Sequence, residues 1–105
     1  MIEVAVLYPA GDGRKFDMDY YLKTHIPLFQ KRMGGAMKAV TVVSGLSGGA
    51  VGSRAPFVAI VRGIFDSPDA FAAAFTPHGA EIQGDIPKYT DIQPVIQISE
   101  VKVQE

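Results

Sequence analysis

The chain has 105 residues, 48% of them hydrophobic and 20% charged, which is the balance of an ordered, soluble protein rather than a disordered one. With 10 basic and 11 acidic residues the net charge is −1, which gives no general attraction to nucleic acid or acidic membranes. The chain contains no cysteine, and this excludes disulfides, thiolate catalysis and cysteine-ligated metal sites.

The first predicted elements are a strand and a helix. Residues 2–9 form a short β-branched run that ends at a proline, which predicts a strand. Asp17 suits the N-cap of the helix that follows, and Gly34 with Gly35 ends this helix near residue 33. The N-terminal apolar run is too short for a signal peptide or a membrane span, so we expect a cytoplasmic protein.

Two further strands and the loop between them occupy the middle of the chain. Residues 38–46 and 57–65 are rich in valine, isoleucine and phenylalanine, which predicts a second and a third strand. The connection between them, residues 47–56, is rich in glycine and serine. We expect this connection to be mobile or to form the end of a hairpin.

The remaining predicted elements are two helical segments and a last strand. Ser67 and Pro68 are typical of the N-cap and the first position of a helix. A shorter helical segment follows at about residues 76–86, and residues 92–103 predict the last strand. The order β-α-β-β-α-β predicts an α+β, ferredoxin-like sandwich with an antiparallel sheet, formed as a single domain over residues 1–105.

The predicted sheet is apolar on both faces. In the first strand Ile2 and Val4 point to one side, whereas Ala5 and Leu7 point to the other. Two helices cover only one face of such a sheet, and the second face would expose more apolar surface than a monomer normally does. We therefore expect a second copy to pack on that face and to form a homodimer, a dimeric α/β barrel.

The first helix carries one polar residue, His25, on its apolar face. A wheel of about 100° per residue gives an apolar arc that contains Met18, Leu22, Ile26, Phe29 and Met33. His25 falls in this arc beside Tyr21, Tyr20 points outward, and Pro27 lies on the solvent face, where it bends the helix without ending it. His25 is either a packed histidine bonded to Tyr21 or to a carbonyl, or an acid/base group.

Two separated motifs resemble the EthD-domain family. The first, F-D-x-x-Y-Y-x-x-x-H-x-P-L, runs from Phe16 to Leu28, and the second, D-I-P-x-Y-T-D, runs from Asp85 to Asp91. The resemblance implies a dimeric α/β barrel of ferredoxin-like subunits with His25 in a cavity between sheet and helices. The family is named for a protein encoded with an ethyl tert-butyl ether degradation system. Its members include accessory proteins of unknown activity and proteins implicated in polyketide and aromatic metabolism, some described as dehydratases or decarboxylases.

A ligand cavity of this kind should be mostly apolar with a few polar groups. The candidate catalytic residues are His25, which can take a proton next to a carbonyl, and Tyr21, whose hydroxyl can stabilise the resulting enolate. The candidate substrate-binding residues are Tyr8, Phe29, Asp85 and Tyr89. The polar ones have structural alternatives: Asp85 as a turn cap, Tyr89 as a packing aromatic and Tyr8 as an edge residue.

Such a site suits dehydration, isomerisation or decarboxylation of a small, partly apolar oxygenated compound without a cofactor. The two histidines form no recognised metal-binding motif. Two alternatives stay open. In the first, the protein is a non-catalytic accessory or binding protein of an oxygenase or degradation system. In the second, it is a haem-binding or monooxygenase-type relative, with His25 as the iron ligand.

Overall fold

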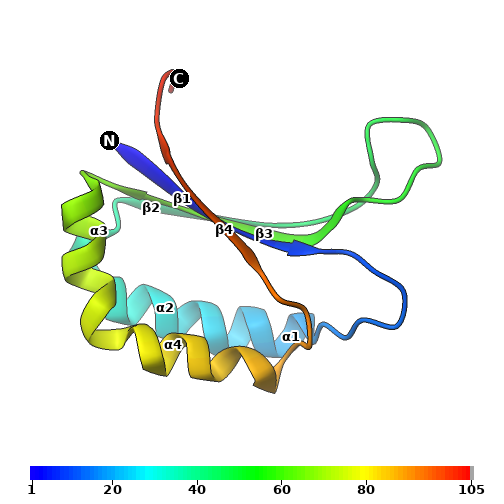
Figure 1. Cartoon of the computed structure of the whole chain (residues 1–105), viewed down its shortest axis with the longest axis horizontal. Coiled ribbons are helices and arrows are strands. Elements are labelled where there is room, and N and C mark those ends of the chain that lie inside the picture. Colours follow the sequence, from blue (N-terminus) through cyan, green and yellow to red (C-terminus); the bar gives the residue numbers. More distant parts are fainter. Residues whose placement is uncertain (105) are drawn as a thin grey trace.

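A four-stranded antiparallel sheet with all helices on one face forms the protein (Figure 1). The computed structural model describes residues 1–104. The strands are β1 (Ile2–Pro9), β2 (Ala39–Ser44), β3 (Phe57–Phe65) and β4 (Val95–Glu100). Their order across the sheet is β2-β3-β1-β4, and every neighbouring pair is antiparallel. This topology confirms the predicted α+β, ferredoxin-like fold.

All four predicted strands are present, but some of them begin or end at other residues than predicted. β1 and β3 have the predicted bounds, whereas β4 begins at Val95 instead of residue 92. Pro94 explains the late start, because proline has no N–H to donate to the sheet. The glycine-rich connection after β2 extends beyond the sheet as a long loop (Figure 1).

The first helical segment consists of α1 (Met18–Tyr20), a π-helical turn (Tyr21–His25) and α2 (Ile26–Met33), which follow one another without a break. Asp17 caps it as predicted, since its carboxylate accepts a hydrogen bond from the backbone N–H of Tyr20. Gly34 ends it with a φ of 55°, a left-handed value that favours glycine.

The π-helical turn changes which side chains face the core. Within it the backbone N–H of Ile26 pairs with the carbonyl of Tyr21, five residues earlier, so the turn is wider than an α-helical one. Pro27, the second residue after this turn, is exposed, as predicted. The wheel, which assumes a uniform α-helix, is wrong for Leu22, which is 48% exposed. It is also wrong for Tyr20, whose hydroxyl bonds a buried carboxylate.

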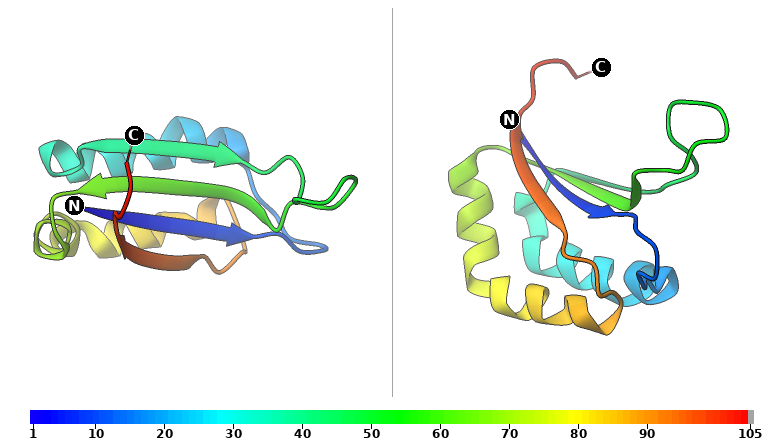
Figure 2. Two further views of the ribbon diagram at one scale, coloured as in Figure 1. Left: turned by 90° about the horizontal axis from the view of Figure 1, so that it is seen from above. Right: turned by 45° about the vertical axis from the view of Figure 1, so that its right-hand side comes forward.

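The second helical segment runs from α3 (Pro68–Phe75) to α4 (Gly79–Asp85), with a short 3-10 turn between them. Ser67 caps α3 as predicted, because its hydroxyl accepts a hydrogen bond from the backbone N–H of Ala70 at 3.0 Å. Figure 2 shows that both helical segments lie under the same face of the sheet. Within residues 1–104, no helix has the length and apolar character needed to cross a membrane.

The core between sheet and helices has two parts. The first is rich in tyrosine and consists of Tyr8, Tyr21, Ile26, Ala59, Val61, Tyr89 and Ile92. The second is aliphatic and phenylalanine-rich and consists of Ile2, Val4, Phe29, Met33, Phe65 and Ile82. His25 and Asp85 are buried polar residues in this otherwise apolar layer. Burial of two titratable groups costs free energy of folding unless the groups are paired with each other or with other polar groups.

The outer face of the sheet is not covered by any element of residues 1–104 (Figure 1). One row across all four strands is apolar and consists of Val43, Ile60, Leu7 and Val95. Val43 and Val95 are 37% and 51% exposed. The next row is mostly polar and contains Thr41, Arg62 and Gln97. The prediction of apolar surface on both faces is therefore confirmed, but the outer apolar surface is narrower than expected.

Candidate functional site

The π-helical turn points His25 into the protein. His25 is only 5% exposed, which confirms its predicted inward position. The rings of Tyr21 and His25 are stacked with their centroids 5.8 Å apart. The ring centroid of Tyr89, which follows the other helical segment, lies 4.7 Å from that of His25. Two tyrosine rings therefore restrict the movement of the imidazole.

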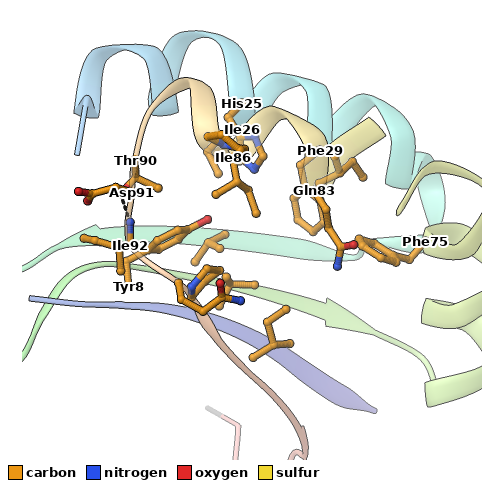
Figure 3. A pocket seen from close by; sticks show the side chains of 17 residues that line it. Tyr8, His25, Ile26, Phe29, Phe75, Gln83, Ile86, Thr90, Asp91 and Ile92 are labelled. Atoms are coloured by element: carbon orange, nitrogen blue, oxygen red, sulfur yellow. Dashed lines mark hydrogen bonds between the residues drawn. The ribbon is translucent and has the colours of Figure 1, made fainter. Parts of the chain in front are cut away.

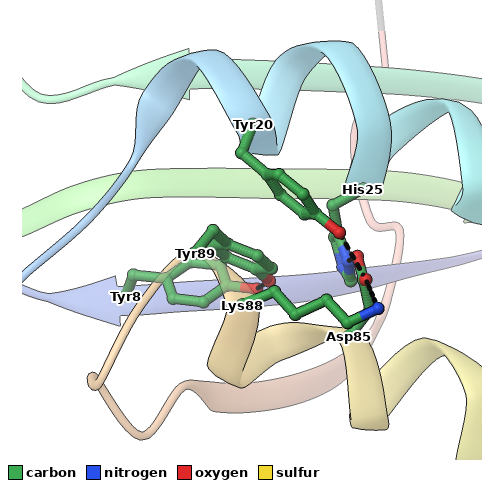
Figure 4. Close-up of polar contacts among 6 residues, drawn as sticks. All are labelled: Tyr8, Tyr20, His25, Asp85, Lys88 and Tyr89. Atoms are coloured by element: carbon green, nitrogen blue, oxygen red, sulfur yellow. Dashed lines mark hydrogen bonds and ion pairs between the residues drawn. The ribbon is translucent and has the colours of Figure 1, made fainter.

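Asp85, at the end of α4, faces His25 across the helix layer (Figure 4). Its Oδ2 lies 3.0 Å from His25 Nδ1, and its Oδ1 accepts a hydrogen bond from the Tyr20 hydroxyl at 2.7 Å. The exposed Lys88 ammonium lies 3.7 Å from the same Oδ1. Both carboxylate oxygens thus have partners within the protein, and the arrangement fixes the orientation of the imidazole.

The charges of this pair follow from their surroundings. Burial lowers the pKa of His25 below its ordinary value of 6.5, and the hydrogen bond to Asp85 offsets part of that effect. Burial raises the pKa of Asp85, but the hydrogen bonds from Tyr20 and His25 outweigh it, so this pKa is lower than its ordinary value of 3.8. At neutral pH a neutral imidazole therefore faces a carboxylate.

This charge state assigns the tautomer. A carboxylate only accepts hydrogen bonds, so the proton of the neutral imidazole lies on Nδ1. The other ring nitrogen, Nε2, then carries a lone pair and can accept a proton or a hydrogen bond. The site therefore has the elements of a general base held in one orientation by a carboxylate.

Three tyrosine hydroxyls lie beside this pair. The hydroxyl oxygens of Tyr8 and Tyr89 are 2.6 Å apart. The Tyr21 hydroxyl is buried and has no hydrogen-bond partner among the described residues. Burial is the main cause that raises the pKa of each of the three, so all three keep their protons at neutral pH.

A cavity of about 500 Å³ lies between the sheet and the helices (Figure 3). Its apolar wall includes Val6, Phe29, Val61, Phe75, Ile82, Ile86 and Ile92, and its polar lining consists of Tyr8, His25, Gln83, Thr90, Asp91 and Gln93. No lysine or arginine is among the described residues that line it. The volume and the apolar wall are typical of a small-molecule site.

The structure brings the six sequence-predicted site residues together in two layers. Tyr8, His25 and Phe29 line the cavity. Tyr21, Asp85 and Tyr89 pack behind that wall, against Tyr8 or His25. Asp85 is bonded to His25 and is not among the residues that line the cavity.

Sequence reasoning missed four polar residues of the cavity lining, Gln83, Thr90, Asp91 and Gln93. It also missed Tyr20, which donates a hydrogen bond to Asp85. The place of Tyr20 follows from the π-helical turn, which a wheel of uniform period does not represent. A signal was available in Pro27, since a proline inside a helix removes one backbone hydrogen bond and makes a departure from α-geometry nearby more favourable.

We predict that His25 titrates below 6.5 in the folded protein, because burial disfavours the imidazolium ion. Asp85→Asn removes the charge that favours this ion, so the pKa of His25 should fall further. Proton NMR titration measures both values, and His25→Gln assigns the signal. A wild-type value at or above 6.5, or the same value in Asp85→Asn, would contradict the assignment.

The same shift has a consequence for stability. Because the folded-state pKa lies below the unfolded one, the unfolded chain binds more protons as the pH falls below about 6.5, and the free energy of unfolding decreases. Denaturant unfolding between pH 7 and pH 5 should show this decrease in the wild type and a smaller one in His25→Gln.

A family description matches most of the chain. The EthD domain model matches residues 13–93, a range that contains both motifs around His25 and Asp85. The chain is also similar to the crystal structure of an EthD-like protein from Ralstonia eutropha JMP134, with 49% sequence identity and a TM-score of 0.93. That similarity covers 99% of this chain and 94% of the other.

Two more distant structures share the fold. An ethyl tert-butyl ether D (EthD) family protein from Bacillus halodurans C-125 has 20% identity and a TM-score of 0.73, with 96% of this chain and 98% of that chain covered. A dimeric ferredoxin-like protein of unknown function from Thermobifida fusca YX has 18% identity and a TM-score of 0.62, with 95% and 90% covered. No curated protein sequence is significantly similar to this chain. Because the EthD domain model matches residues 13–93, which is most of the chain, the chain belongs to the EthD domain family.

Proposed function

We propose that the protein binds a small, partly apolar oxygenated metabolite, aromatic or polyketide-like, and catalyses an acid/base reaction on it without a cofactor. Dehydration, isomerisation and decarboxylation belong to this class. The observation that carries the proposal is the His25–Asp85 pair, 3.0 Å apart, with His25 in the wall of an apolar cavity of about 500 Å³.

The proposed role of His25 is that of a general base. With the Nδ1 proton bonded to Asp85, Nε2 is free to take a proton from a carbon next to a carbonyl group of the ligand. The imidazolium that forms is then stabilised by the Asp85 carboxylate. The apolar wall strengthens this interaction, since charges attract more strongly where water is excluded.

Tyr20 and Tyr21 support this role from behind. Tyr20 donates to Asp85 Oδ1, which leaves Oδ2 for His25. Asp85 also holds the pKa of the Tyr20 hydroxyl above its ordinary value, so Tyr20 stays a donor at neutral pH. The ring of Tyr21 stacks on the imidazole and limits its rotation. We assign both tyrosines as positioning residues.

The lining fits haem poorly. His25 Nε2 is a suitable iron ligand. Haem also carries two carboxylates, however, and the described lining residues include no lysine or arginine to pair with them and one carboxylate, Asp91, to repel them. We therefore do not assign a haem-dependent activity to this chain.

Proton transfer can be tested with 2-tetralone, an apolar bicyclic ketone with acidic hydrogens on the carbon between its carbonyl group and its aromatic ring. In deuterated buffer the wild type should accelerate hydrogen–deuterium exchange at that carbon, measured by NMR. His25→Gln should lower the protein-catalysed rate by about 10²–10⁴-fold, the usual contribution of a general base. His78→Gln, which changes the histidine that lies outside the cavity lining, is the matched control and should keep the rate.

The outcomes separate the two functions. Equal rates for the wild type and His25→Gln would remove His25 from catalysis. Saturable binding of 2-tetralone with exchange at the buffer rate would instead identify a binding or accessory protein. No binding of the ketone would count against the proposed ligand class.

We further propose that two copies pack through the outer face of the sheet. The apolar row of Val43, Ile60, Leu7 and Val95 crosses that face and is continuous over all four strands. A similar fold forms dimers in the Thermobifida fusca protein. A second copy of this chain offers a complementary row, because a two-fold interface joins the same patch from each copy.

Charge on the apolar row should separate the two copies. We expect a dimer at micromolar concentration by sedimentation velocity, and a monomer for the double variant Val43→Asp with Val95→Asp. Leu22→Asp is the matched control: Leu22 is 48% exposed, close to Val95 at 51%, but lies on the helical side. A monomeric wild type, or a dimeric double variant with native circular dichroism, would contradict this interface.

A further inference from the structure

The general-base mechanism leaves three hydroxyls unused. Tyr8, Tyr21 and Tyr89 are 1%, 0% and 3% exposed, and they meet beside the cavity. Of the three, Tyr8 lines the cavity, and Figure 3 shows its hydroxyl oxygen pointing into that space. A deprotonation next to a carbonyl leaves negative charge on the carbonyl oxygen, which needs hydrogen-bond donors to hold it.

The hydrogen bond between Tyr8 and Tyr89 has a preferred direction. Each hydroxyl has one proton to donate, and their oxygens are 2.6 Å apart. If Tyr8 were the donor, the Tyr89 proton would be buried, and the described side chains offer it no other hydrogen bond. If Tyr89 is the donor, its buried proton is satisfied, and the proton of Tyr8 is directed into the cavity, where a ligand oxygen can accept it. An unsatisfied buried donor is costly, so the second arrangement is favoured.

Tyr21 supplies a second hydroxyl behind Tyr8. The two rings meet edge to face with centroids 5.5 Å apart. The Tyr21 hydroxyl is buried and lacks a partner among residues 1–104 described by the structure. A buried donor without an acceptor forms its most favourable hydrogen bond when negative charge develops on a nearby oxygen. Charge on a ligand oxygen bound by Tyr8 polarises the Tyr8 hydroxyl, whose oxygen becomes a better acceptor for both neighbours.

The lining also limits the charge of the ligand that enters. The described lining residues include no lysine or arginine, and Asp91 lies at the wall. A carboxylate or phosphate would therefore lose its hydration without gaining a cationic partner. A neutral ligand has no such cost, and its oxygen becomes anionic only after its proton has moved to His25 Nε2.

We propose that Tyr8, supported by Tyr89 and Tyr21, is the oxygen-binding group of the cavity and that its ligands are neutral phenols or enolisable cyclic ketones. The inference rests on the proposed function of His25. In the step concerned, an O–H or C–H bond of the ligand breaks, its proton joins Nε2 of His25, and the electron pair remains on the ligand as a phenolate or enolate. Tyr8 donates its hydrogen bond to that oxygen.

A matched pair of probes tests the oxygen site. 4-Nitrophenol and 4-nitrotoluene have nearly the same shape and share the nitro group, but only the phenol has a hydroxyl, whose oxygen Tyr8 can bind and whose proton His25 can take. The wild type should bind the phenol at least tenfold more tightly than the toluene analogue, and the absorption of the bound phenol should be that of the phenolate. Tyr8→Phe should remove this preference while retaining affinity for 4-nitrotoluene, which shows that the cavity is intact.

Tyr89→Phe provides a second, independent test. It leaves the Tyr8 hydroxyl in place but removes the donor behind it, so the preference for the phenol should fall to a value between those of the wild type and Tyr8→Phe. This test remains available if Tyr8→Phe does not fold. A preference that is unchanged in Tyr89→Phe and in a folded Tyr8→Phe would overturn the inference.

The remaining outcomes distinguish this inference from the proposed function. Equal affinities of the wild type for the two probes would overturn the oxygen site alone. A preference for the phenol that is lost in His25→Gln but kept in Tyr8→Phe would also overturn it, while it would support His25 as the base. Binding of neither probe would count against both, since both expect a small, partly apolar ring compound in this cavity.

Discussion

The site depends on one hydrogen bond, the 3.0 Å contact between His25 Nδ1 and Asp85 Oδ2. It joins the two helical segments, fixes the imidazole and compensates for the burial of both groups. It also leaves Nε2 as the free nitrogen of an imidazole in the cavity wall. Without the carboxylate, a histidine at this place would be an ordinary packed side chain, which was the structural alternative that the sequence left open.

The frame that holds this bond could be predicted in large part. The caps at Asp17 and Ser67 and the bounds of β1 and β3 follow from local rules, and the structure confirms them. The pairing of His25 with Asp85 could not be derived in this way, because it links positions 60 residues apart and depends on how the helical segments pack. Resemblance to a family selected both residues but not their contact.

The π-helical turn shows where local rules fail. A wheel of uniform period placed Leu22 inside and Tyr20 outside, whereas Leu22 is exposed and Tyr20 is half-buried with its hydroxyl on Asp85. The wider turn lets Tyr21 and His25 face the core while Tyr20 reaches Asp85 from the side. π-helical turns are frequent at functional sites, and the one histidine of this turn, His25, contacts Asp85 and lines the cavity.

The proposed chemistry of the site requires His25 to be neutral, with its proton on Nδ1. Nitrogen-15 NMR of the imidazole at pH 7 tests it most directly, because the two ring nitrogens have different chemical shifts in each tautomer and similar ones in the imidazolium ion. The wild type should show a protonated Nδ1 and an unprotonated Nε2. An imidazolium ion, or a neutral ring with its proton on Nε2, would contradict it.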